Sequence, residues 1–192
     1  DSTFPASLVT IGESAFASSG ILSATFPSNS ALTTIEAEAF LATDLTAINI
    51  PSNVTTIGEY AFGSTSALTS VSFASGSALT TIGEYSFSDA TGLSSITIPA
   101  SIQTIGRFAF DGATSLTTVS FASGSALTTI EAGAFRDAQE LTSITIPASV
   151  TSIGANAFRY AHNLARVTFE PGSQLATIGM RAFEEAYKLT SI

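Results

Sequence analysis

Hydroxyl groups are the commonest side chains able to take part in chemistry, since the chain holds 29 serines and 27 threonines among its 192 residues. Cysteine is absent, and His162 is the only histidine. A nucleophilic site needs a nucleophile, a base and an orienting acid in one pocket, and a histidine metal site needs further ligands. The acidic residues lack the D-x-D-x-D-G spacing that wraps a calcium ion. We therefore expect no enzyme activity, no cofactor and no metal site.

Many of these hydroxyls lie at alternate positions of a short recurring phrase, L-x-x-(I/V)-x-(I/F). Its apolar residues alternate with small polar ones, which predicts a short strand with one buried and one exposed face. Neighbouring strands then carry two hydroxyl ladders on the exposed face. The predicted ligand-binding residues on this face are Ser70, Ser72, Ser95, Thr97, Thr118, Ser120, Ser143, Thr145, Arg166 and Thr168.

The ladders have three interpretations. In the first they only favour strand formation and solubility, because threonine has a high strand propensity and small hydroxyls cost little there. In the second they form a flat recognition surface for a glycan or an extended polypeptide. The third and most remote is ice binding, since regular hydroxyl ladders resemble the threonine arrays of ice-binding solenoids. Arg166 and the mixture of serine with threonine interrupt the uniform grid that a lattice match needs.

A second group of candidate residues is aromatic and basic. Tyr60, Tyr85 and Phe108 occupy one column of three successive repeats, whereas Arg159, Tyr160 and Tyr187 lie near the C-terminus. Aromatic anchors dominate interface energetics, so we predict a partner patch from these six residues. The alternative is a structural stack of rings together with an ordinary solvated face. On that face, Asp111 beside Arg136 and Glu184 beside Arg159 are predicted ion pairs, each worth little.

The elements that would position these residues follow from a second phrase, I-(G/E)-x-x-(A/S)-F, which occurs eight times. Its phenylalanines are separated by 22 to 25 residues, and fixed periods of this length are typical of a solenoid. They are Phe16, Phe40, Phe62, Phe87, Phe110, Phe135, Phe158 and Phe183. Two forms of link alternate, which gives a double unit of 48 residues, and the stretch Val71 to Ile82 recurs unchanged at Val119 to Ile130.

Each repeat is predicted to contribute one strand and one short helical turn. The first link position after the strand phrase, where the absence of a backbone donor is tolerated, holds Pro5, Pro27, Pro51, Pro99 and Pro147. The next phrase, T-I-G-E, has the spacing of a capping box and predicts the start of a helix that carries the Ala-Phe pair. A lone repeat cannot bury its apolar side chains, but stacked repeats can.

Joined together, the phrases read L-x-x-I-x-I-P-x-x-V-x-x-I-G-x-x-A-F, and this pattern resembles the BspA-type leucine-rich repeat of bacterial and protist surface proteins. The likeness runs from Phe4 to Ile192. It implies an α/β solenoid: a right-handed leucine-rich-repeat array of eight coils, with a parallel β-sheet on the concave face and short helices or turns on the convex face. It further implies an adhesion or interaction module without catalytic residues.

The net charge and the hydropathy of the chain limit the classes of partner that we expect. The net charge is −9 with six Lys and Arg residues, which argues against nucleic acid because phosphate contacts need clustered cations. No apolar run reaches the length of a membrane span, so we expect no direct membrane insertion. We expect an extracellular or cell-surface recognition module that binds a protein or glycan ligand on a host or neighbouring cell.

The domain organisation is predicted to be a single solenoid segment over residues 1–192. The chain begins and stops inside the strand phrase, so we expect a segment cut from a longer array without its caps. The alternative is a structural spacer, or a subunit that associates end to end into a filament, since open sheet edges are normally covered.

Overall fold

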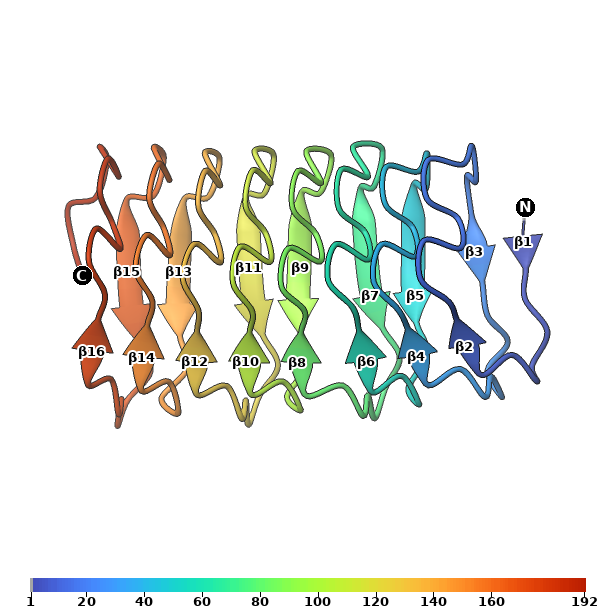
Figure 1. Cartoon of the computed structure of the whole chain (residues 1–192). Helices are drawn as coiled ribbons and strands as arrows, with labels where there is room; N and C mark the ends of the chain where they lie inside the picture. The colour runs from blue at the N-terminus through green and yellow to red at the C-terminus, as the bar shows by residue number, and fades with distance from the viewer. Residues whose placement is uncertain (1) are drawn as a thin grey trace.

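The repeated phrases form successive coils of a parallel β-solenoid in the computed structural model, which describes residues 2–192. Figure 1 shows the coils side by side in one row, with the two termini at opposite ends. Each coil contributes one strand to a larger sheet and one two-residue strand to a smaller layer. The handedness and the concave position of the larger sheet stay predictions.

The larger sheet contains eight parallel strands, neighbours in space being neighbours along the chain. Inward positions such as Ile96 and Val119 are buried, and the residues on either side of them are exposed, as the alternation predicted. The strands are β1 (Ser2–Thr3), β3 (Ala24–Thr25), β5 (Ala47–Ile50), β7 (Ser70–Phe73), β9 (Ser95–Ile98), β11 (Thr118–Phe121), β13 (Ser143–Ile146) and β15 (Arg166–Phe169).

A second layer of short strands was not predicted. The Thr-Ile or Ser-Ile pair of each coil, placed by the sequence at a helix start, pairs in parallel with the same pair of a neighbouring coil. These strands are β2 (Thr10–Ile11), β4 (Thr34–Ile35), β6 (Thr56–Ile57), β8 (Thr81–Ile82), β10 (Thr104–Ile105), β12 (Thr129–Ile130), β14 (Ser152–Ile153) and β16 (Thr177–Ile178). The isoleucines from β2 to β14 point into the core and are buried.

The predicted helices and capping boxes are wrong, because the Ala-Phe phrase forms turns and residues 2–192 contain no helix. Tyr60 and Ser64 have φ values of 52° and 53°, in the left-handed region that ends a right-handed helix. Turn bonds run from Ala61 N–H to the Gly58 carbonyl and from Gly63 N–H to the Tyr60 carbonyl, at 3.3 and 2.9 Å. The N–H groups that alternate with these turn donors, such as that of Phe62, point out of the coil, which no α-helix allows.

Those donors join each coil to the next. The N–H of Phe62 donates to the Ser86 carbonyl at 2.8 Å, and the same bond recurs from Phe16 to Phe158 at 2.7 to 2.9 Å. The turns therefore form a continuous ladder across the whole array. At Gly83 the neighbouring coil leaves no room for a side chain, since a Cβ atom there would lie 2.4 Å from the Ile57 carbonyl oxygen, whereas Glu36 and Glu131 occupy the same position of the phrase in two other coils.

The phenylalanine rings form one column beneath the turns. Adjacent rings lie parallel with centroids 5.2 to 5.4 Å apart. The six inner rings, Phe40 to Phe158 in the column, are fully buried, and the rings of Phe16 and Phe183 are partly buried. The predicted dry interior shared by neighbouring coils is confirmed.

Candidate ligand-binding face

The ten predicted ligand-binding residues lie on the outer side of the larger sheet, on five consecutive strands from β7 to β15. Nine of them are exposed, and Thr168 is half-buried. The sheet thus brings all ten to one face, because alternate residues of every strand point outward.

The strands of this face are joined in pairs rather than evenly, as Figure 1 shows. Four residues of β9 pair with four of β11, and β5 with β7 and β13 with β15 do the same. By contrast β7 pairs with β9 only through Ser70 and Ser95, and β11 with β13 only through Thr118 and Ser143. We call the β7–β9 junction seam 1 and the β11–β13 junction seam 2.

Proline in alternate links accounts for the seams. Within a tight pair the residue after the second strand donates back to the first, as Ala74 N–H does to the Ile50 carbonyl at 2.9 Å and Ala122 N–H to the Ile98 carbonyl at 2.9 Å. Across the seams this position holds Pro99 or Pro147, which have no N–H to donate. The backbone ladder therefore ends early at both seams.

The hydroxyl ladders are interrupted at the same places. Within tight pairs Thr97 lies 3.4 Å from Ser120, and Thr145 lies 2.8 Å from Thr168, measured between hydroxyl oxygens. Among residues 2–192, no hydrogen bond links Ser72 to Thr97 or Ser120 to Thr145, the corresponding pairs across the seams. The ladders are thus grouped by twos.

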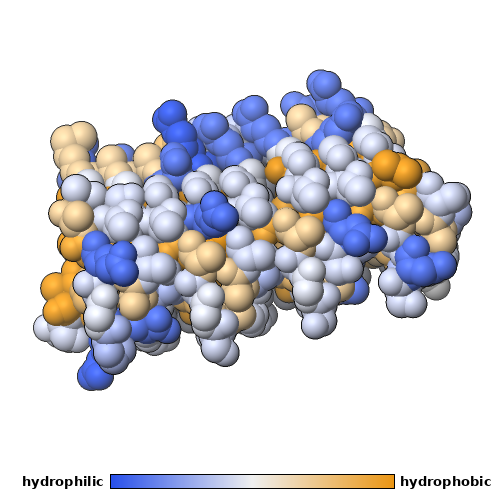
Figure 2. Space-filling model, turned by 90° about the horizontal axis from the view of Figure 1, so that it is seen from below, coloured by the Kyte–Doolittle hydropathy of each residue, from blue (hydrophilic) through white to orange (hydrophobic). Residues whose placement is uncertain are grey.

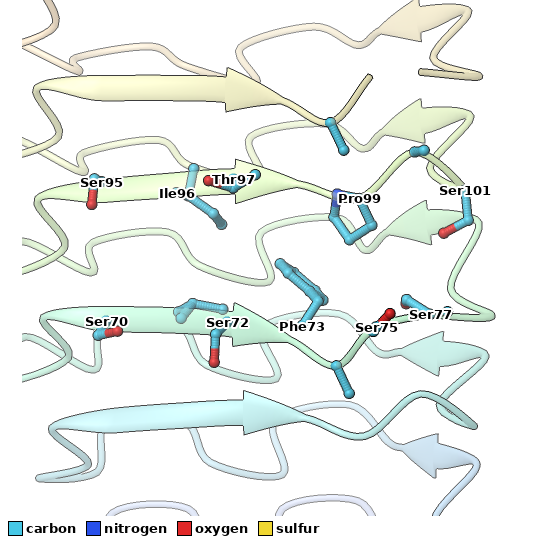
Figure 3. A pocket seen from close by; sticks show the side chains of 15 residues that line it. Ser70, Ser72, Phe73, Ser75, Ser77, Ser95, Ile96, Thr97, Pro99 and Ser101 are labelled. Carbon is cyan, nitrogen blue, oxygen red and sulfur yellow. The ribbon is translucent and has the colours of Figure 1, made fainter. Parts of the chain in front are cut away.

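The surface is hollowed at seam 1 to form groove 1, with a volume of about 500 Å³ (Figure 3). Phe73 and Pro99 point into the gap from the ends of the two strands. Ser70, Ser75 and Ser95 are exposed on its rim, and their hydroxyls make no hydrogen bond within residues 2–192. The other lining residues are Val71, Ser72, Ala74, Gly76, Ser77, Ile96, Thr97, Ala100, Ser101 and Ala122, none of them charged.

Groove 2 is the corresponding hollow at seam 2, with a volume of about 260 Å³. Its lining residues Thr118, Ser120, Phe121, Ser143 and Thr145 each lie 48 positions after a residue that lines groove 1. Compared over all positions that line groove 1, the two hollows differ only by Thr118 for Ser70 and Glu170 for Ala122.

Glu170 accounts for the smaller volume of groove 2. Its side chain lines the hollow, and its carboxylate accepts a hydrogen bond from Ala148 N–H at 3.1 Å. Pro147 beside it is buried, whereas the equivalent Pro99 of groove 1 is half-buried. The larger, charged side chain of Glu170 thus covers part of groove 2, whereas the methyl group of Ala122 leaves the equivalent part of groove 1 open.

The links that form the lower end of groove 1 lie at the underside of the coils in Figure 1. Figure 2 views this underside, which is mostly covered by residues of intermediate hydropathy, with isolated hydrophobic and hydrophilic groups between them. This intermediate hydropathy agrees with the serine, threonine, alanine and glycine residues of the links.

The predicted aromatic patch separates into two clusters. Tyr60, Tyr85 and Phe108 stack on one another with centroids 4.5 and 5.0 Å apart. Arg136 covers the end of this stack, its guanidinium carbon 5.0 Å from the Phe108 centroid. Burial is the main cause that raises the pKa of the Tyr60 hydroxyl above its ordinary value. The rings thus use their faces on each other, as the structural alternative predicted.

The C-terminal residues of the patch follow the phenylalanine of their coils, whereas Tyr60, Tyr85 and Phe108 precede it. Arg159 lies over the Tyr160 ring at 4.3 Å, and Tyr187 stacks on His162 at 5.1 Å. No ring contact joins these residues to the Tyr60 stack within residues 2–192. The six residues therefore form two clusters, and the binding of a partner by either cluster stays a prediction.

Both predicted ion pairs are confirmed. Arg136 donates two hydrogen bonds to Asp111, at 2.7 and 2.6 Å, and Arg159 pairs with Glu184. The Asp111 hydrogen bond raises the pKa of Arg136 above its ordinary value. Burial raises the pKa of Asp111, while Arg136 opposes this shift.

Residues 2–192 hold no cluster of three or more acidic or histidine side chains suited to a metal ion. Over the same residues there is no helix with the length and hydropathy needed to cross a bilayer.

Comparison with known proteins places the fold and the repeat. A family model described as "BspA type Leucine rich repeat region (6 copies)" matches residues 1–91 and 80–192. No curated protein matches the sequence. Among solved structures, the pneumococcal vaccine antigen PcpA superposes with a TM-score of 0.68 at 26% identity, over 89% of this chain and 40% of that one.

Two further proteins are also similar. A leucine rich cell surface protein of Faecalibacterium prausnitzii A2-165 has a TM-score of 0.61 at 25% identity, over 99% of this chain and 58% of that one. A leucine-rich repeat protein of Bacteroides ovatus has a TM-score of 0.58 at 20% identity, over 99% and 73%, and bears on the fold alone. The chain thus spans 40% and 58% of the first two structures.

Proposed function

Because the chain belongs to the family of BspA-type leucine-rich-repeat proteins, we propose that it is a non-enzymatic recognition module outside the cell. In this proposal the outer side of the larger sheet binds a protein or glycan ligand of a host or neighbouring cell. The observation that carries it is the gathering of ten hydroxyl or basic side chains on a face hollowed by two grooves.

The composition of this face supports recognition over a purely solvating role. Concave sites with an apolar floor and a few polar groups are the usual form of binding sites. Groove 1 combines Val71, Ile96 and Phe73 with seven serine or threonine hydroxyls. Its volume lies within the range of about 300–1,000 Å³ that is typical of small-molecule sites.

The similar structures support the location. One is described as a cell surface protein and another as a vaccine antigen, and both descriptions belong to those proteins. Ice binding is less favoured, since the seams break the regular spacing that a lattice match needs.

The second candidate is a structural spacer, favoured by the unbroken ladder of turns and the continuous phenylalanine column. These features would give a stiff rod whether or not the sheet binds anything. End-to-end self-association belongs with this candidate. A binding experiment separates the two.

To test the proposal, Thr97, Ser120 and Thr145 are replaced together by lysine in a fluorescent fusion of the chain. Capture is measured on printed glycans, extracellular-matrix proteins and epithelial cells. We expect at least a tenfold loss of capture, because three long cations cover the face. The matched control places lysines at Thr56, Thr81 and Thr177, which are exposed on the layer of short strands. Equal capture by the two triple variants, or no capture by the unmodified chain, contradicts the proposal and leaves the spacer.

A further inference from the structure

We infer that groove 1 is a binding site for a neutral saccharide; the inference rests on the proposed function and names the ligand class of one part of that face. Groove 1 is the hollow at seam 1, between β7 and β9. Its volume of about 500 Å³ is suited to one or two sugar rings of a longer chain.

The lining of groove 1 excludes a charged ligand. It contains no Lys, Arg or His that would pair with a carboxylate, sulfate or phosphate, and no Asp or Glu that would pair with an amine. The net charge of −9 further disfavours acidic polymers. A ligand that is both neutral and rich in hydrogen-bonding groups remains.

The hydroxyls of the rim match the hydroxyls of a sugar. Each serine or threonine hydroxyl donates one hydrogen bond and accepts others, as every sugar hydroxyl does. The hydroxyls of Ser70, Ser75 and Ser95 have no hydrogen-bond partner among residues 2–192 and are free to bond a ligand. Ser101 and Ser72, by contrast, donate to the Leu79 carbonyl and to Asn49 at 2.7 and 2.9 Å.

The gap between the strands offers an apolar surface for the C–H groups of a pyranose ring. Phe73 and Pro99 are each partly exposed and point into the gap from opposite strands (Figure 3). Together with the free hydroxyls they give the mixed surface that a sugar needs, since its ring carbons and its hydroxyls are satisfied at once.

An extended peptide is less favoured at this place. Peptides that bind sheets do so by adding a strand to an open edge, where main-chain groups are unpaired. Here β7 and β9 are each fully paired on their outer sides and are joined to each other by Ser70 and Ser95, so the unpaired main-chain groups beyond these two residues lie between two strands of one sheet and not at an open edge. Groove 1 therefore offers side-chain hydroxyls rather than a free strand edge.

Groove 2 supplies an internal control built into the chain. It repeats the lining of groove 1 except at two positions, and Glu170 fills part of it. We therefore expect one saccharide site per chain. Exchanging Ala122 and Glu170 between the grooves should therefore close groove 1 and open groove 2.

The test measures binding of cellohexaose, maltohexaose and laminarihexaose to the whole chain by isothermal titration calorimetry and saturation-transfer NMR. A sulfated heparin hexasaccharide and a neutral Gly-Ser-Thr hexapeptide are titrated in parallel. We expect at least one of the three neutral sugars to bind with a stoichiometry of one. Binding of the peptide in place of all sugars overturns the ligand class, and tighter binding of the sulfated sugar overturns the argument from charge.

Two reciprocal variants locate the site. Ala122→Glu places in groove 1 the side chain that fills groove 2, so we expect at least a tenfold loss of affinity. Glu170→Ala opens groove 2, so we expect the stoichiometry to rise from one to two. Ala176→Glu is the matched control, because it adds the same charge at an exposed position of the smaller sheet side and should leave binding unchanged.

The outcomes keep this inference separate from the proposed function. If Ala122→Glu binds the sugar like the unmodified chain, while circular dichroism shows both to be folded, the site is not groove 1. If no sugar binds but the triple-lysine variant still loses capture of cells or matrix proteins, the saccharide inference fails and the recognition function stands. If nothing is captured by any assay, both fail.

Discussion

The turn side of the solenoid and its larger sheet differ in how evenly neighbouring coils are joined. On the turn side the same N–H to carbonyl bond joins every coil from Phe16 to Phe158, at 2.7 to 2.9 Å. On the sheet, four-residue pairing alternates with pairing through one residue. One sequence period thus produces a uniform interior and, from β5 onward, a surface with twice that period, because from Pro51 onward proline directly follows alternate strands.

This difference suggests that the turn side supplies stability and the larger sheet supplies the binding surface. The phenylalanine column and its ladder of turns bury apolar surface in every coil, so substitutions there should cost stability. The seams leave strand ends apart and hollow the surface, so substitutions there should alter shape and binding at little cost. Three predictions test this contrast, beginning with the largest expected effect.

Replacement of Phe110 by alanine should break the continuous side. The ring is fully buried and stacks on Phe87 and Phe135, each at 5.3 Å. We expect the free energy of unfolding to fall by about 3–5 kcal/mol, the usual cost of removing a buried phenylalanine. Urea denaturation followed by circular dichroism measures it. Thr97→Ala on the exposed sheet is the control, expected within about 0.5 kcal/mol of the unmodified chain; equal losses would contradict the contrast.

Gly83→Ala tests the close approach of coils behind the turns. A Cβ atom there would lie 2.4 Å from the Ile57 carbonyl oxygen, so the backbone must shift. We expect a loss of about 1–3 kcal/mol, as for other overpacked positions. Gly12→Ala occupies the same place in the first phrase, where the nearest atom is Glu36 Oε2 at 3.8 Å. If thermal melting shows the two variants to be equally stable, the approach of the coils does not require glycine.

Pro99→Ala should partly close seam 1 with the smallest change in stability. The new N–H can donate to the Phe73 carbonyl, worth about 0.5–1.5 kcal/mol, while loss of proline frees the unfolded chain by about 0.4–1 kcal/mol. The net change in unfolding free energy is therefore within about 1 kcal/mol. We expect slow hydrogen exchange at the new amide and a smaller groove 1 in a crystal structure. Pro171→Ala, at an exposed link position, is the control. A fast-exchanging amide at residue 99 would show that proline does not cause the seam.

The parts of the fold that follow from burial could be predicted from the sequence. Eight phenylalanines at a solenoid period indicated one column, and alternation around Ile96 or Val119 indicated one exposed strand face. Both are confirmed, since each depends on where apolar residues recur. The family resemblance is confirmed as well.

The error in the helix prediction could not be found from the sequence, because the local sequence signals favoured a helix. Glutamate at the helix start and alanine within it favour a helix, and Tyr60 or Tyr85 is not expected in the left-handed region. Bonds to the neighbouring coils and ring stacking hold these residues there, at φ values of 52°. Ser64, Asp89 and Gly112, which recur four residues later, were the available clue.

The candidate face was predicted but its hollows were not. All ten proposed residues lie on one side of the sheet, as the period of two required. The alternation of Ala74, Pro99, Ala122 and Pro147 after the strands was visible in the sequence, and so was the 48-residue unit. Their effect was missed because it depends on which carbonyl each donor would meet in the neighbouring coil.

The 48-residue unit also bears on how such a surface can change over generations. Each unit carries a complete strand pair and contributes to a seam, and the stretch Val71 to Ile82 recurs without change at Val119 to Ile130. Unequal recombination between such copies would insert or delete two coils without disturbing the stacking on either side. The number of binding sites per chain would then follow the number of 48-residue units in the gene. A single codon, as at Glu170, would decide whether the groove of a new unit is open.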